Sequence, residues 1–102
     1  MQERRTAERF RTNVNARWEA LAAQGRGSVC DFSSTGCFVL TGGEVKPRDL
    51  IRLELIADDQ ITVLWGFVVY HVPEMGFAIR FAITGDDYKQ KIENVIALME
   101  RR

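Results

Sequence analysis

Two arginines near the N-terminus and three residues of a later stretch have the types that contact phosphates and purine bases. Arg5 and Arg9 are four positions apart, and Asp31, Ser33 and Gly36 lie together further along the chain. The planar guanidinium of arginine makes paired hydrogen bonds to phosphate oxygens, and its face stacks on a purine. A carboxylate accepts hydrogen bonds from a guanine edge, and a hydroxyl can bond a phosphate or a base.

Both stretches also have a structural explanation. Residues 31–36, Asp-Phe-Ser-Ser-Thr-Gly, separate two apolar runs, a pattern that predicts a turn or bulge between two strands. In that turn Gly36 is expected to adopt a positive φ. Residues 1–11 carry four arginines and two glutamates. They would form a solvated terminus, or a short helix with Arg5 and Arg9 on one face.

Taken in this order, the two stretches resemble the signature of the PilZ domain, the bacterial receptor module for cyclic di-GMP. That signature is RxxxR followed by [D/N]xSxxG, and the resemblance covers the whole chain. It implies that cyclic di-GMP is the ligand and that no other cofactor is needed. The residues that it places at the ligand are Arg5, Arg9, Asp31, Ser33 and Gly36, with Arg4 and Arg11 as auxiliary contacts. By the same analogy, residues 1–11 form a mobile arm that wraps over ligand held on a barrel surface.

Length and composition indicate a single small globular domain. The 102 residues are 46% hydrophobic and have a formal net charge of +0, which argues against disorder and against a general binder of polyanions. No apolar run is long enough to cross a membrane, and the polar, charged N-terminal residues lack the apolar stretch of a signal peptide. Cys30 and Cys37 are too few for a zinc site, although they could face each other across a hairpin. We expect both to be reduced core residues of a cytoplasmic protein.

Hydrophobic periodicity predicts a mainly β fold, a six-stranded antiparallel β-barrel with a C-terminal α-helix. The barrel is expected over 12–83, after the arm at 1–11, and the helix over 84–102. The predicted strands are 14–20, 28–30, 37–41, 50–57, 61–72 and 77–81. A Thr84–Asp87 capping box would begin the helix. Its apolar stripe is Tyr88, Ile92, Val95, Ile96 and Met99.

Alternation also predicts which strand residues face the core. Val14, Ala16 and Trp18 share one face, as do Ile51, Leu53 and Leu55. In the long strand 61–72, Ile61, Val63, Trp65, Phe67 and Val69 share a face, so Trp65 is expected to lie inward with Trp18 in the core. Gly66 within that strand indicates a bulge or a close approach of another backbone.

No catalytic constellation is recognisable, and we expect that the protein is not an enzyme. His71 is predicted to be structural or exposed, and no Walker loop or metal-binding cluster is found. The predicted function is a cyclic di-GMP receptor and adaptor that changes shape and signals to an unidentified partner protein, in bacterial motility or envelope regulation as the resemblance suggests. The alternatives are a PilZ-fold interaction module that does not depend on the nucleotide, or a small-barrel binder of single-stranded nucleic acid. The neutral net charge counts against a nucleic acid polymer.

Overall fold

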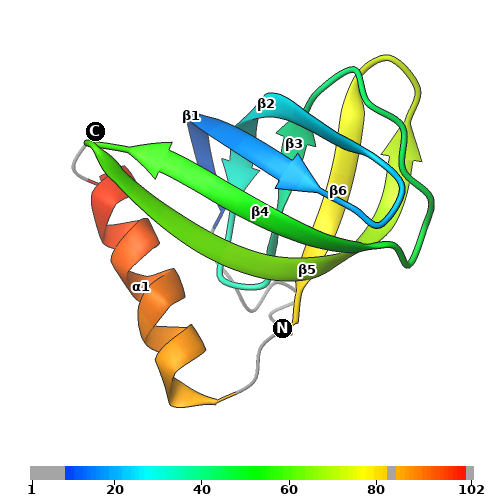
Figure 1. The fold of residues 1–102 in the computed structure, drawn as a ribbon. Helices are drawn as coiled ribbons and strands as arrows, with labels where there is room; N and C mark the ends of the chain where they lie inside the picture. Colours follow the sequence, from blue (N-terminus) through cyan, green and yellow to red (C-terminus); the bar gives the residue numbers. More distant parts are fainter. Residues whose placement is uncertain (1–8, 83–84, 101–102) are drawn as a thin grey trace, which may run out of the picture.

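The computed structural model of the chain describes residues 9–82 and 85–100. Within these residues six antiparallel strands close a barrel in the order β1-β2-β3-β6-β5-β4, and one helix follows (Figure 1). The elements are β1 (Phe10–Glu19), β2 (Gln24–Phe32), β3 (Gly36–Leu40), β4 (Leu50–Ala57), β5 (Gln60–Val72), β6 (Gly76–Phe81) and α1 (Asp86–Glu100). The predicted barrel and helix are therefore confirmed. Since β1 begins at Phe10, residues 10 and 11 of the expected arm belong to the barrel. Arg4, Arg5 and Thr84 lie outside the described residues.

The core is built from the inward faces of alternating strands. Val14, Ala16 and Trp18 of β1 are buried as predicted, and Trp18 lies opposite Leu53 of β4. The Trp18 ring meets Phe77 of β6 edge-on, with ring centroids 5.1 Å apart. Its indole N–H donates to the Thr41 hydroxyl at 3.1 Å, so the polar atom of this buried side chain is satisfied. The barrel interior is thus a packed apolar core and leaves function to the outer surface.

The inward face of β5 is the opposite of the one predicted. Leu64, Gly66 and Val68 point into the barrel, whereas Trp65 is 42% exposed on the outside. The prediction was wrong because β5 is apolar at nearly every position, so alternation does not distinguish its two faces. Gly66 marks a close approach, as expected, because a Cβ there would lie 2.6 Å from the Arg80 carbonyl oxygen. The register shift is further along, between Val68 and Tyr70.

Helix α1 packs beside the first part of β5, residues 60–65, which is not paired with β6 (Figure 1). The Tyr88 hydroxyl accepts the Trp65 N–H at 2.9 Å and donates to the Trp65 carbonyl at 2.7 Å. The Lys91 ammonium donates to the Val63 carbonyl at 3.2 Å. The predicted apolar stripe packs on the barrel, with Ile92, Val95 and Met99 buried. No helix in the described part of the chain is long and apolar enough to span a bilayer.

Candidate functional site

The turn between β2 and β3 holds its polar residues in a fixed arrangement. Phe32 is fully buried at the end of β2, so Asp31 on its N-terminal side points outward. The Ser33 N–H donates to the Gly36 carbonyl at 2.9 Å, which closes the turn. The Phe81 N–H donates to the Thr35 carbonyl at 2.8 Å, which ties the turn to the end of β6. The turn is shorter than the predicted 31–36, because β2 runs to Phe32 and β3 begins at Gly36, so only 33–35 lie between the two paired strands.

Antiparallel pairing of β1 with β2 brings Arg9 of the first motif next to Asp31 of the second. Phe10 lies opposite Phe32, and Arg11 lies opposite Asp31. One step before β1, the Arg9 guanidinium forms an ion pair with the Asp31 carboxylate, with Nη2 and Oδ2 2.5 Å apart. The hydrogen bond to Asp31 raises the pKa of Arg9, which stays charged. The two side chains are 59% and 31% exposed, so a ligand in solvent can reach both.

Ser33 uses its hydroxyl within the turn. Its oxygen accepts the Thr35 N–H at 3.2 Å and lies 3.3 Å from the Gly36 carbonyl, to which it can donate. The Thr35 hydroxyl is 3.2 Å away. Such bonds from a serine to its own turn are common and fix the backbone there. The structure therefore gives Ser33 a role in shaping the turn, and any bond to a ligand would have to be added to these.

Gly36 does not have the positive φ that we expected; the glycines that do are Gly76 and Gly85. It is needed for space instead. Gly36 is paired with Arg80 of β6, and a Cβ at this position would lie 2.2 Å from the Ile79 carbonyl oxygen. The close approach of β3 to β6 therefore excludes a side chain here.

These residues border a shallow groove of about 200 Å³ on the outside of the barrel. We call it the Arg9 groove. Arg9, Asp31, Ser33 and Gly36 line it, so four predicted residues share one surface; Arg11 is exposed nearby on β1. The sequence did not identify the other lining residues, which include Thr35, Val69, Tyr70, Ala78 and Arg80. Arg80 had one signal, since it is the charged residue of the otherwise apolar strand β6.

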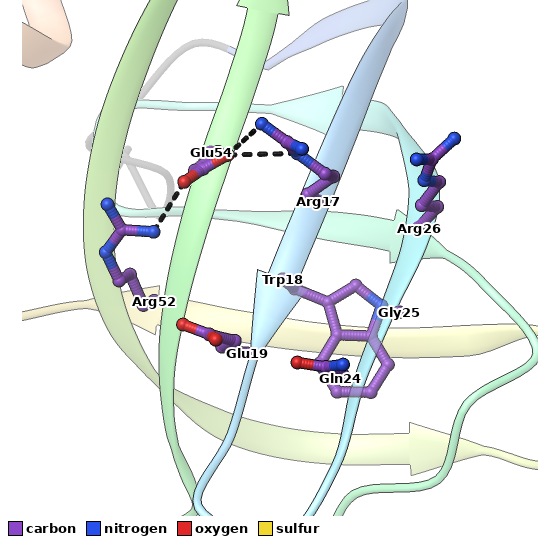
Figure 2. Close-up of a pocket in the computed structure, with 8 residues that line it drawn as sticks. All are labelled: Arg17, Trp18, Glu19, Gln24, Gly25, Arg26, Arg52 and Glu54. Carbon is purple, nitrogen blue, oxygen red and sulfur yellow. Dashed lines mark hydrogen bonds and ion pairs between the residues drawn. The ribbon is translucent and has the colours of Figure 1, made fainter.

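A second hollow, shown in Figure 2, lies on the outer face of β1, β2 and β4. Glu54 stands between two arginines there and accepts a hydrogen bond from Arg17 at 3.1 Å and one from Arg52 at 2.5 Å. The bond from Arg52 is the main reason that the pKa of Glu54 is lowered. Although this hollow is larger, about 470 Å³, none of the residues predicted to contact the ligand lines it. We therefore regard the Arg9 groove as the candidate site.

The cysteines do not form a site. The register places Phe32, not Cys30, opposite Cys37, so the expected facing pair is not formed. Cys37 is buried, and burial raises the pKa of its thiol. Among the described residues no three His, Cys, Asp or Glu side chains are grouped so that they could hold a metal ion.

Comparison with known proteins identifies the family to which this barrel belongs. The family model for the PilZ domain matches residues 3–98. The chain belongs to the PilZ domain family. PilZ domains are regulatory receptor and adaptor modules, and cyclic di-GMP is a ligand of this family. No curated protein matched the sequence.

Solved PilZ domains have the same fold at low sequence identity. The PilZ domain of CeSA from a cellulose-synthesizing bacterium has a TM-score of 0.78 and 12% identity, covering 91% of this chain and 98% of that one. The PilZ domain of YcgR from Escherichia coli, solved with c-di-GMP, has a TM-score of 0.81 and 15% identity, covering 97% and 93%. The Bacillus subtilis inhibitor of motility MotI has a TM-score of 0.67 and 13% identity, covering 99% of this chain and 53% of that one.

Proposed function

We propose that this PilZ domain binds cyclic di-GMP at the Arg9 groove and passes the signal to a partner protein. The observation that supports the proposal most strongly is the contact between Arg9 and Asp31 beside the 33–36 turn. Arg9 of the first motif and the residues of the second, which are far apart in the sequence, thereby share one exposed surface. The family match and the c-di-GMP in the similar YcgR domain make this nucleotide the first ligand to test.

The chemistry that we propose is an exchange of partners. Without ligand, the Arg9 guanidinium donates to Asp31. A phosphate of the ligand can replace Asp31 as the acceptor of this guanidinium through paired, charge-assisted hydrogen bonds. The released Asp31 carboxylate can then accept the N–H groups of a guanine edge. Exposed ion pairs contribute little stability, about 0–1 kcal/mol, so breaking this one costs little compared with the bonds gained.

The small size of the groove supports a contribution from the N-terminal residues. Pockets that enclose a small ligand usually measure about 300–1,000 Å³, and the Arg9 groove is smaller. A dinucleotide would therefore rest on the surface and need cover from another part of the chain. We propose that Arg5, with Arg4 and Arg11 as auxiliary contacts, provides that cover. This part of the proposal rests on the family signature, since Arg4 and Arg5 lie outside the described residues.

A titration of the purified protein with three ligands tests the proposal. We expect heat of binding with cyclic di-GMP and none with GTP or a short single-stranded oligonucleotide. Binding to the oligonucleotide alone would favour the nucleic-acid alternative. Failure of all three would favour an interaction module that does not depend on the nucleotide.

We further propose that the protein acts in the bacterial cytoplasm, in motility or envelope regulation. Deletion of its gene would test the proposed process through swimming and surface phenotypes.

A further inference from the structure

The outward face of β5 is unusually apolar for a solvent-facing strand. Five large hydrophobic side chains of this strand are substantially exposed: Ile61, Trp65, Phe67, Val69 and Tyr70. Phe67 and Val69 are 48% and 51% exposed, and Leu50 of β4, directly opposite Phe67, is 45% exposed. Scattered exposed hydrophobic residues are normal, but a contiguous group commonly marks a contact surface.

Part of this face is hollowed. We call it the β5 hollow and define it by Arg48, Phe67, Val69, Arg80 and Ala82, which line a space of about 480 Å³. The main chain of Arg48 is held beside β5, just before β4, because its backbone N–H donates to the Val68 carbonyl at 2.8 Å. Arg80 stands on the other side, in β6, opposite Phe67. The hollow therefore has an apolar floor between two arginines.

The charges of the β5 hollow indicate what could fill it. Arg48 and Arg80 are exposed, and neither forms an ion pair with a described residue. The neighbouring carboxylate of Asp49 accepts the Lys46 backbone N–H at 3.0 Å and forms no ion pair with Arg48. Two guanidinium groups with no ion-pair partner among the described residues repel a basic ligand and attract carboxylates, and a solvent-exposed apolar floor favours contact with hydrophobic side chains.

We propose that the β5 hollow is the docking site for a segment of a partner protein that presents hydrophobic side chains flanked by Asp or Glu. The inference rests on the proposed adaptor function, because it names the surface through which the adaptor would act. The hollow adjoins the Arg9 groove: Val69 and Arg80 line both. Arg80 is also paired with Gly36 of the 33–36 turn, so ligand and partner would meet at one arginine.

Two other occupants fit less well. In a two-fold dimer through this face the same patch meets itself, and the lining of the β5 hollow contains two arginines and no carboxylate to pair with them. A bilayer is flat, whereas a recessed floor is filled by a protruding side chain. Both remain outcomes of the experiment.

A random dodecapeptide library displayed on phage is a suitable probe, used without nucleotide. We expect the selected peptides to combine hydrophobic residues with Asp or Glu. Arg48→Glu and Phe67→Ser should each weaken their binding by about tenfold or more, as expected for loss of a charge-assisted bond or a buried aromatic contact. The matched controls are Arg26→Glu and Leu21→Ser, an exposed arginine and an exposed leucine elsewhere, and these should leave binding unchanged. Thermal melts check that all four variants fold.

Several results would overturn the docking site. One is a selection that yields no peptides, or peptides that bind the Arg48→Glu and Phe67→Ser variants as well as the wild type. Another is a wild-type dimer in sedimentation that Phe67→Ser dissociates, which would make a second copy the occupant. If the wild type binds vesicles of phosphatidylglycerol and Phe67→Ser abolishes that binding, the occupant of the β5 hollow would be a lipid surface. Calorimetry with cyclic di-GMP on the same variants reports separately on the proposed function, because Arg48 and Phe67 do not line the Arg9 groove.

Discussion

Arg9 and Asp31 are separated by all of β1 and most of β2, and strand pairing brings their side chains into contact. A lysine at position 9 would keep the charge but lose the planar fork and the stacking face. We predict that Arg9→Lys weakens binding of cyclic di-GMP about tenfold or more, roughly 1.4 kcal/mol, and that Arg9→Ala weakens it further. Calorimetry measures both. Arg26→Lys, at an exposed arginine outside the groove, should bind normally.

Asp31 should control the choice of base. Guanine presents N–H donors to a carboxylate where adenine does not, so removal of the acceptor affects guanine more. We predict that Asp31→Ala weakens binding of cyclic di-GMP and reduces its preference over cyclic di-AMP. Titration of wild type and variant with both nucleotides checks this. If the preference for cyclic di-GMP is unchanged in a variant whose melting temperature matches that of the wild type, Asp31 does not contact the guanine edge.

At the residue scale, the sequence was informative where a motif is local and uninformative where a site depends on register. Asp31, Ser33 and Gly36 are close in the chain, so it was predictable that they lie together around one strand connection. Arg80 and Tyr70 reach the same groove only because β6 pairs with both β3 and β5. The Val68/Tyr70 register shift then leaves both Val69 and Tyr70 on the surface. No pattern in a single sequence specifies such a shift.

At the element scale, the contact between β3 and β6 depends on Gly36. A methyl group there would lie 2.2 Å from the Ile79 carbonyl oxygen, too close without movement of the strands. We predict that Gly36→Ala lowers the free energy of unfolding by about 1–3 kcal/mol, the usual cost of overpacking. Urea denaturation measures the change. Gly42→Ala is the matched control, because a Cβ at Gly42 meets nothing within 4 Å, and an equal effect of both substitutions would refute the steric explanation.

The orientation of β5 shows where element-scale prediction stops. In β1 and β4 polar residues alternate with apolar ones, so their inward faces were predicted correctly. In β5 both faces are apolar, and the outward face was taken for the inward one. The glycine at position 66 carried usable information, since it faces inward where β6 comes close. The outward face of β5, which was predicted to face the core, carries Phe67 and Val69 of the β5 hollow.

At the scale of the whole molecule, barrel closure buries groups that could ionise. Burial raises the pKa of the Cys37 thiol above its ordinary 9.0 and raises the pKa of Tyr88 above 10.0. Above pH 9 the unfolded chain therefore releases a proton that the folded chain keeps, so the free energy of unfolding must fall as pH rises. One such group gives a slope of about 1.4 kcal/mol per pH unit.

We therefore predict that between about pH 9 and 10.5 the free energy of unfolding falls less steeply with pH in Cys37→Val than in the wild type. The two slopes should differ by close to the value for one proton, about 1.4 kcal/mol per pH unit. Denaturation at a series of pH values measures the slope, and the value at pH 7 separates any packing effect of valine from titration. A variant with the wild-type slope would show that Cys37 does not retain its proton in the folded barrel.

The whole-molecule prediction from sequence was sound for fold and family because length, alternation and the paired motifs all indicated the same barrel. Its central claim about function, binding of cyclic di-GMP, is tested most directly by a calorimetric titration of the wild-type protein. We predict a dissociation constant in the nanomolar-to-micromolar range, about −8 to −12 kcal/mol. Absence of binding heat from folded protein at roughly hundred-micromolar nucleotide would contradict it.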